Sequence, residues 1–362
     1  MIKSEFISDA TLSNSKEQWQ FAEDILQKVS RTFALNIQVL PTRLRKPVLL
    51  AYLLCRIADT IEDDPDLSAD AKEYSLRLFS QIFTDAQNST EHLNLFIESI
   101  PETWTYSEIP DQFLCLKLPW IMPLYNNFSQ NIKDPIIQCI KEMTVGMAQF
   151  ARRQEDSAHD WLSISSEADL DNYCYHVAGV VGNMLCDLFF IQSPLIGRKR
   201  YEKMRKLAVS FGLGLQVTNI VKDIKEDSLR QVCFIPLDWI QEAGFSSPAD
   251  LFKNENSEKQ AQLALRLAEK AQKHLSDAVK FTILIPSLEH RIRLFCLWPL
   301  FMATETLVAL GDGKAVFAEK KVKITRTQVK NIIRTTGLRA WCNRWVQRSF
   351  KNYEQQINSF KK

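Results

Sequence analysis

The stretch "DTIEDD" places four carboxylates within six residues, directly after the apolar run "VLLAYLLCRIA". On a helix, Asp59 and Asp63 would project from one face with Glu62 beside them, because residues four apart lie one turn above each other. Like charges at this spacing repel, so the arrangement is locally unfavourable unless a counter-charge is present. We therefore predict that these three residues bind a metal ion.

A second acidic stripe follows later, in "LGLQVTNIVKDIKED", where Asn219, Asp223 and Asp227 are spaced by four and Glu226 lies beside them. Hard oxygen ligands with room for water suit Mg²⁺, which often binds through a few carboxylates together with substrate phosphates. Two facing stripes could hold Mg²⁺ around a diphosphate, making it a better leaving group and ionising the carbon attached to it. The alternative interpretation is that each run is a solvated helix end.

The elements that must position these stripes are helices nearly throughout, because the chain has few helix breakers, with 10 Gly and 13 Pro. The run over 44–64 is apolar almost all round, which is typical of a central buried helix. Asn14 or Ser15 is a candidate cap for the first helix, and a short element that Pro41 ends follows Ser30. The patterns predict helices over 14–30, 44–64, 69–87, 132–156, 168–191, 197–227, 257–281, 287–311 and 326–360.

The fold class that follows is all-α, without strands, and the stretches 100–124 and 228–256 are interpreted as connections. We expect one domain over residues 1–362, with a core over about 15–345. The formal net charge of +2 does not indicate a nucleic-acid partner. Eight cysteines without a CxxC pair predict reduced, buried thiols.

No apolar run reaches the length of a membrane span, and the N-terminus is polar rather than a secretory signal. We therefore expect no transmembrane helix. Surface contact with a membrane remains open. The expected location is the cytoplasm, with contact to the inner face of a membrane as a further possibility.

The two stripes resemble the paired aspartate-rich motifs of the squalene/phytoene synthase family, whose members join isoprenyl diphosphates head to head. "SRTFA" (30–34) resembles the family's flap, and "YLLCRIADTIEDD" (52–64) its approach to the first motif. "YCYHVAGVVG" (173–182) is similar to a further family segment. "KAVFAEKKVKITRTQV" (314–329) resembles the squalene synthase branch in particular. The resemblance spans residues 28–330 in register.

The resemblance implies a single isoprenoid synthase helical bundle around a deep central cavity, acting on two farnesyl diphosphates. With Mg²⁺ they would form presqualene diphosphate, which NADPH would reduce to squalene. The alternative is a presqualene diphosphate, dehydrosqualene or phytoene synthase without the reductive step. A non-catalytic relative acting as an assembly factor is the alternative from another class. We expect a monomer with peripheral membrane contact for product release.

The resemblance also implies roles for single residues. The catalytic set is Tyr173, for proton handling, with Asp59, Asp63, Asp223 and Asp227. The metal ligands are Asp59, Glu62, Asp63, Asn219, Asp223 and Asp227. The substrate-binding residues are Ser30, Arg31, Phe33, Tyr52, Arg56, Val177, Ala178, Val181, Gly182, Leu185, Gln216 and Lys222. The candidates for the NADPH phosphate are Lys321 and Lys323.

Each role has a structural alternative. The apolar residues could be plain core packing, and Arg56, whose fork suits phosphate oxygens, could pair with the neighbouring acids. The Tyr173 hydroxyl could be structural, and Lys321 and Lys323 could form a solvated basic strip. We assign no role to His176.

Two departures from the family pattern concern the second stripe. Val232 stands where the family usually has an Arg of the diphosphate-binding surface, although Arg230 is nearby and could substitute for it. Lys222 stands where Arg is commoner, which keeps the charge but loses the bidentate fork. The altered Arg position keeps the alternative products open.

Overall fold

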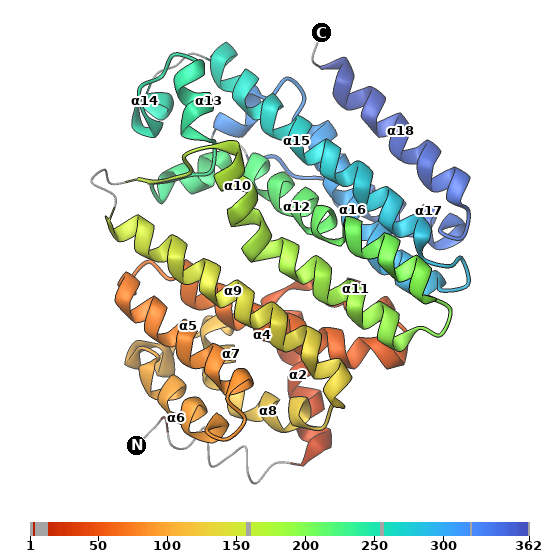
Figure 1. Ribbon diagram of the computed structural model, residues 1–362. Helices are drawn as coiled ribbons and strands as arrows, with labels where there is room; N and C mark the ends of the chain where they lie inside the picture. Colours follow the sequence, from red (N-terminus) through yellow and green to blue (C-terminus); the bar gives the residue numbers. More distant parts are fainter. Residues whose placement is uncertain (1–2, 4–13, 157–160, 254–256, 319–320, 361–362) are drawn as a thin grey trace. The chain divides into compact units, whose positions relative to one another are not determined.

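The computed structural model describes residues 3, 14–156, 161–253, 257–318 and 321–360, and these residues are helical almost throughout (Figure 1). The expected all-α fold class is therefore confirmed. Residue contacts divide the chain into two compact units. Unit 1 comprises Met1–Glu155 and Asp187–Gln192, and unit 2 comprises Asp156–Cys186 and Ser193–Lys362. The expectation of one domain over the whole chain stays a prediction.

Unit 1 is built around the central helix α4, which packs against α2, α5 and α7. Leu50, Leu53 and Ile57 of α4 are fully buried, as the continuous apolar pattern predicted. The helical segments of unit 1 are α2 (Ser15–Val29), α3 (Arg31–Val39), α4 (Thr42–Asp63), α5 (Ala69–Thr84), α6 (Ser89–Ser99), η1 (Glu102–Tyr106), α7 (Pro110–Leu116), α8 (Leu118–Asn126) and α9 (Gln130–Asp156).

The predicted start of the first helix is confirmed in detail. The Asn14 side chain accepts hydrogen bonds from the backbone N–H groups of Lys16 and Glu17, at 3.0 and 3.1 Å. The Glu17 carboxylate accepts the N–H of Asn14 at 3.2 Å, which completes a capping box. Further along, α3 ends just before Pro41, as expected.

The stretch 100–124 is not the connection that its prolines suggested, because it contains η1, α7 and most of α8. Pro110 and Pro119 stand in the first turns of α7 and α8, where a missing N–H breaks no hydrogen bond. Leu114 and Ile121 are completely buried, which anchors both helices. These two prolines therefore mark helix starts, whereas Pro123 lies inside α8.

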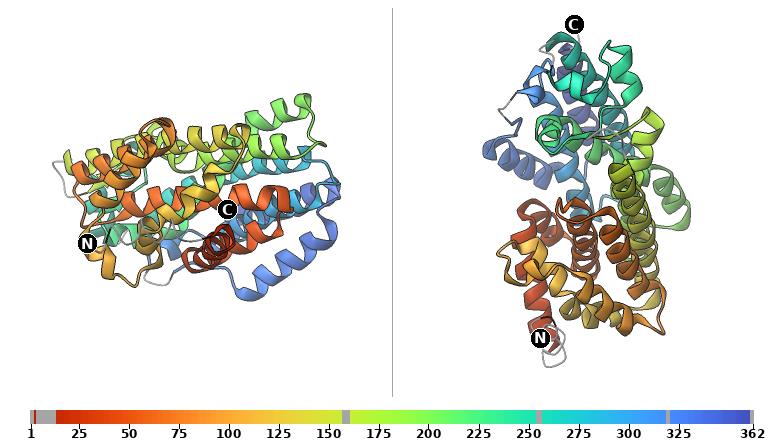
Figure 2. Two further views of the ribbon diagram at one scale, coloured as in Figure 1. Left: turned by 90° about the horizontal axis from the view of Figure 1, so that it is seen from below. Right: turned by 90° about the vertical axis from the view of Figure 1, so that its left-hand side faces the viewer.

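Unit 2 is centred on α12 and α15, which lie side by side (Figure 1), and Figure 2 shows the same helices in green to blue from two further sides. The segments that carry residues of unit 2 are β1 (Leu162–Ser163), α10 (Glu167–Cys174), the π-helical turn η2 (Tyr175–Gly179), α11 (Val180–Gln192), α12 (Arg198–Leu229), β2 (Val232–Cys233), α13 (Leu237–Glu242), α14 (Pro248–Lys253), α15 (Ser257–Leu284), α16 (His290–Ala309), η3 (Lys314–Phe317), α17 (Arg326–Arg339) and α18 (Asn343–Ser359).

Three expectations for unit 2 were wrong. A two-residue parallel pair exists, with Leu162 opposite Val232 and Ser163 opposite Cys233. The stretch 228–256 contains β2, α13 and α14. The helix expected over 326–360 is two helices, α17 and α18, separated at residues 340–342. The break between the two helices could not be predicted, because residues 326–360 contain no Pro.

The cysteines are free thiols, and all but the partly exposed Cys342 are buried, as expected. Two helical segments among the described residues, Glu167–Gln192 and His290–Ala309, have the length and composition of a membrane span. This is weak evidence for a span, because buried core helices pass the same test and 72% of the second window lies inside the protein.

Candidate active site

The first acidic stripe lies on the last two turns of α4. Asp59 is half-buried and Asp63 is exposed. Burial and the neighbouring charge of Asp63 raise the pKa of Asp59 to about 7, while Arg56 acts in the opposite direction. A buried carboxylate whose pKa is raised by a neighbouring carboxylate is a place where a cation is favourable.

The C-terminal end of α4 contacts a buried lysine that sequence reasoning missed. Lys72 of α5 donates a hydrogen bond from Nζ to the backbone oxygen of Glu62, at 2.6 Å. A cation at this position stabilises the free carbonyls at a helix end. Burial lowers the pKa of Lys72, opposed by the charges of Glu62 and Asp63. The sequence did contain an indication that Lys72 is buried, because it lies on the same helical face as the buried Leu76 and Phe79.

Arg56 is paired with an acid from another helix. Its Nε donates to Oδ1 of Asp111 at 2.6 Å. Burial lowers the pKa of Arg56, but the hydrogen bond and the charge of Asp111 outweigh it and raise the pKa above its usual value. Asp111 was missed because it lies in the first turn of α7, within a stretch interpreted as a connection.

The flap residues lie next to Tyr52 of α4. Ser30 caps α3 by accepting the N–H of Phe33 at 3.3 Å, and the rings of Phe33 and Tyr52 are 5.3 Å apart. Burial raises the pKa of Tyr52, and a hydrogen bond with Ser30 opposes this. Phe33 is 40% exposed, so core packing does not account for it. The side chain of Arg31 lies outside the described part of the chain.

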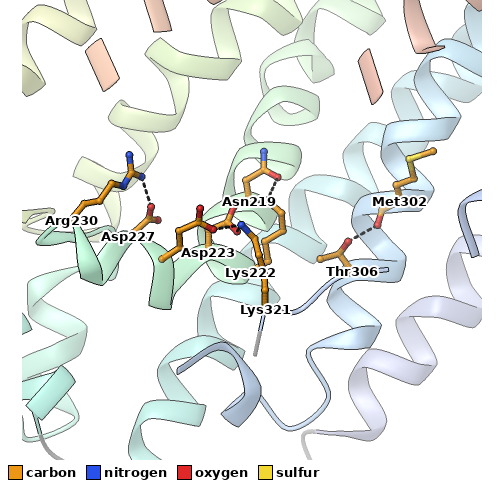
Figure 3. A network of polar contacts seen from close by, with 9 residues as sticks. Asn219, Lys222, Asp223, Asp227, Arg230, Met302, Thr306 and Lys321 are labelled. Atoms are coloured by element: carbon orange, nitrogen blue, oxygen red, sulfur yellow. Dashed lines mark hydrogen bonds and ion pairs between the residues drawn. The ribbon is translucent and has the colours of Figure 1, made fainter. Parts of the chain in front are cut away.

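The second stripe, on α12, is contacted by two lysines (Figure 3). Lys222 Nζ lies 3.0 Å from Asn219 Oδ1 and 2.5 Å from Asp223 Oδ2. Lys321 Nζ lies 3.5 Å from Asp223 Oδ1 and forms an ion pair with Glu226. Oδ1 of Asp223 is buried and accepts no hydrogen bond within the described residues.

The third member of this stripe, Asp227, is buried and accepts a hydrogen bond from Arg230 Nη2 at 2.7 Å (Figure 3). Burial raises the pKa of Asp227 to about 6, opposed by Arg230. Val232, at the departure from the family pattern, is buried in β2. Arg230 therefore supplies a guanidinium to this stripe. Gln216, further back on α12, is half-buried.

The two lysines predicted for a cofactor phosphate differ in their surroundings. Lys321 lies on the second stripe, where it lowers the pKa of Glu226. Lys321 is exposed, but its ion pairs with Glu226 and Asp223 distinguish it from a lysine that contacts only solvent. Lys323 is exposed. Their assignment to NADPH stays a prediction.

Tyr173 is buried on α10, and its ring stacks on Phe234 with 4.6 Å between the centroids. The buried Lys270 of α15, which sequence reasoning missed, holds this helix. Its Nζ lies 2.8 Å from Glu167 Oε1 and 2.8 Å from Asp171 Oδ1. Because Asp171 is two residues before Tyr173, this ion pair fixes the segment that carries the tyrosine.

The small residues of "VAGVVG" bring two helices into backbone contact. A Cβ on Gly182 would lie 2.1 Å from the backbone oxygen of Ala208, and one on Gly212 would lie 2.2 Å from that of Ala178. Helix packing within unit 2 therefore requires both glycines. Val177, Val181 and Leu185 are half-buried.

The oxygen ligands of each stripe fit Mg²⁺ in chemistry, and Oδ1 of Asp223, which accepts no hydrogen bond within the described residues and has only Lys321 at 3.5 Å, could bind a cation. Within the described ranges, however, no group of three or more His, Cys, Asp or Glu side chains is close enough to hold one ion. The first stripe belongs to unit 1 and the second to unit 2. The metal ligands predicted from the sequence stay a prediction.

Comparisons with known proteins place this geometry in context. The family profile described as squalene/phytoene synthase matches residues 26–328. The chain is 30% identical over 350 residues to a squalene synthase from Schizosaccharomyces pombe, which covers 93% of this chain and 70% of that protein. It is 32% identical over 321 residues to a squalene synthase from Solanum lycopersicum, covering 88% and 70%. Among solved structures, TcSQS in complex with a ligand, BPH1237, aligns with a TM-score of 0.76 at 26% identity, covering 95% of this chain and 92% of that one.

Proposed function

We propose a reaction for this chain from one premise: the chain belongs to the squalene/phytoene synthase family, and it is a prenyltransferase with the helical isoprenoid synthase fold. The proposed reaction joins two farnesyl diphosphates head to head to give presqualene diphosphate, with Mg²⁺ as the metal. An NADPH-dependent reduction then gives squalene. The observation that carries the proposal is that both acidic stripes are intact, each beside basic side chains, in a relative of squalene synthases.

Unit 1 offers residues that could hold a diphosphate. The guanidinium fork of Arg56 matches phosphate oxygens, and because its Nε is bound to Asp111, its two Nη groups would be directed to the substrate. Tyr52 and the flap residues Ser30 and Phe33 lie beside it on the same unit. We assign diphosphate binding to Arg56 and Tyr52.

Unit 2 offers the second set of carboxylates and a phenol. In the proposed reaction, the C1–O bond of one farnesyl diphosphate breaks and its electron pair leaves with the diphosphate. The 2,3-double bond of the other substrate attacks C1, and loss of a proton closes the cyclopropane ring. Bound Mg²⁺ would supply the charge that stabilises the leaving diphosphate. We assign the proton transfer to Tyr173 acting with that diphosphate, because a neutral phenol is a weak base.

The reductive step requires a cation that binds the NADPH phosphate. Lys323 is an exposed cation that could bind an NADPH phosphate. Lys321 could do the same only if it left Glu226 and Asp223. We further propose a monomer that is peripheral to a membrane, since squalene is an apolar product.

Product analysis tests the proposal. The purified chain would be incubated with farnesyl diphosphate and Mg²⁺, with and without NADPH, and the extract analysed by mass spectrometry. We expect squalene only when NADPH is present, and no product from Asp59→Asn or Asp223→Asn. If farnesyl diphosphate is not consumed, the proposal is wrong, and a longer prenyl substrate or a non-catalytic role replaces it.

The alternative is a synthase that lacks the reductive step. The departure at Val232 favours it, because the guanidinium that the family usually carries at this position comes here from Arg230, two residues earlier, where it binds Asp227. This alternative predicts presqualene diphosphate, dehydrosqualene or phytoene irrespective of NADPH. The same assay distinguishes the two.

A further inference from the structure

Three helix connections of unit 2 lie close together. The Ser193 hydroxyl donates to the buried Glu289, which joins the α11–α12 connection to the α15–α16 connection. Arg293 donates to Asn343 Oδ1 at 2.5 Å and to the backbone oxygen of Ile285 at 3.4 Å. These two bonds join the α15–α16 connection to the start of α18. Figure 1 shows these connections and the α17–α18 turn on the same side of unit 2.

Large apolar side chains protrude at these connections. Leu195 is 45% exposed, Leu288 83%, Leu338 69% and Trp341 60%. We call these four residues the apolar tips. The indole N–H of Trp341 is already satisfied by the backbone oxygen of Leu338 at 3.0 Å, so the ring can enter an apolar phase without losing a hydrogen bond.

Basic residues are concentrated beside the apolar tips. On α17, the exposed Arg326, Lys330 and Arg334 are spaced by four and lead directly to Leu338, so they form one stripe with it. Residues 326–353 carry seven basic side chains and no acidic one, whereas the rest of the chain has 38 basic and 43 acidic residues. The exposed run 198–200, "RKR", follows Leu195 closely. The net positive charge of this chain is therefore gathered on the segment 326–353, which contains Leu338 and Trp341.

We propose that this face of unit 2 docks on an anionic phospholipid membrane, with the apolar tips inserted among the acyl chains and the α17 stripe on the headgroups. Isolated exposed apolar residues are ordinary on any protein, but here four stand together and are accompanied by cations. A nucleic acid would use the cations but leave the leucines in water. A second copy of the chain would place like charges opposite each other. A bilayer satisfies both features, because its surface attracts Lys and Arg and its interior accepts Leu and Trp.

Vesicle co-sedimentation of the full chain tests the proposal. The probes are phosphatidylcholine vesicles with and without phosphatidylglycerol. We expect binding to the anionic vesicles that weakens as salt is added, and little binding to the neutral ones. Lys330→Gln and Arg334→Gln should each weaken binding about fivefold, the amount expected for one basic side chain near a charged bilayer. Leu288→Asn combined with Trp341→Ser should weaken it at least about tenfold, as expected when buried apolar groups are removed.

Matched controls come from unit 1. Tyr106 is 70% exposed, so Tyr106→Ser removes a comparably exposed apolar side chain that belongs to the other unit. Lys28→Gln and Lys141→Gln each remove one exposed charge. These variants should bind vesicles as the unchanged chain does. Circular dichroism and turnover of farnesyl diphosphate in detergent solution check that the tip variants remain folded.

Several outcomes would overturn the proposal. These are no binding to anionic vesicles, binding that the tip variants leave unchanged, or equal loss in the unit 1 controls. A dimer that Trp341→Ser dissociates, without vesicle binding, would make this face a subunit contact instead. The inference does not depend on the proposed reaction, since vesicle binding is measured without substrate.

Discussion

Arg56 on α4 is fixed by Asp111 on α7 through a single short hydrogen bond, Nε to Oδ1 at 2.6 Å. The bond uses the inner nitrogen of the guanidinium, and within the described residues the two outer nitrogens remain available for another partner. Asp111 is thus a positioning residue for the arginine that we assign to diphosphate binding.

Asp111→Asn should therefore raise KM for farnesyl diphosphate and lower kcat/KM by about tenfold or more, as expected for the loss of a charge-assisted hydrogen bond. Steady-state kinetics would measure it, and Asp111→Glu should recover part of the loss. Asp70→Asn is the control, because Asp70 pairs with Arg152 on the surface of the same unit. Unchanged kinetics in Asp111→Asn would remove the positioning role.

Removal of the metal should stop the reaction. Treatment with a chelator is expected to abolish turnover, and Mg²⁺ should restore it. Asp59→Asn and Asp223→Asn should show no turnover at any Mg²⁺ concentration while their circular dichroism stays unchanged. Activity that survives both substitutions would show that the acidic stripes do not act through a metal.

Gly182→Ala should destabilise the fold. Its Cβ would meet the Ala208 oxygen at 2.1 Å, so α11 and α12 must separate, at a cost of about 1–3 kcal/mol. Gly337→Ala is the matched control, because no atom lies within 4 Å of a Cβ there and alanine is the better helix former. Thermal unfolding followed by circular dichroism should show a lower midpoint for the first variant and an equal or higher one for the second. Equal midpoints for both would mean that the contact is not tight.

The Lys270 ion pairs should contribute to stability only between two pH limits. The pKa of Glu167 is lowered, mainly by its hydrogen bond to Lys270, so its contribution is present above the unfolded pKa of about 4.3 and is lost as pH falls through the lower folded value. Burial lowers the pKa of Lys270, but hydrogen bonds to Asp171 and Glu167 outweigh it. Because the net shift is upward, that contribution is complete below about pH 10 and disappears as pH rises through the folded value.

Lys270→Met should therefore be less stable than the unchanged chain by about 1 kcal/mol near neutral pH, a modest amount because both carboxylates are about half exposed. The difference should shrink below about pH 4. Chemical denaturation across a pH series measures it. Lys273→Met, which removes an exposed pair with Glu269, should show no such dependence.

Elements with a regular apolar pattern could be predicted from the sequence. The prediction failed where one residue type is compatible with two local structures. The buried α4 and the stripe-bearing α12 were predicted within a few residues of their ends, because a long apolar period has one interpretation. The region of α7 and α8 was misread because proline can either break or begin a helix. That error hid Asp111, the partner of Arg56.

Spacing predicts which acidic side chains share a helix face better than it predicts their partners. It grouped Asp59 with Asp63 and Asp223 with Asp227, whose role as site residues stays a prediction, but spacing does not reveal which cation contacts them from a distant segment. Lys321 lies 98 positions after Asp223 in the chain and still contacts it. Lys72 and Lys270 each lie on the buried face of an amphipathic helix. A charged residue among apolar positions is unusual, and this is the one feature of the sequence that could have predicted two buried lysines.

The π-helical turn at Tyr175–Gly179 constrains how this chain can change in length. Such a turn holds one residue more than the α-helix around it, so whatever follows is rotated by about 100° relative to an uninterrupted helix. Deleting Ala178 would restore a regular helix and carry Gly182 away from Ala208. A relative without the turn should align with this chain only through a one-residue gap at this point. A deletion here would therefore leave a regular helix, whereas a deletion elsewhere in the helix would disturb its packing.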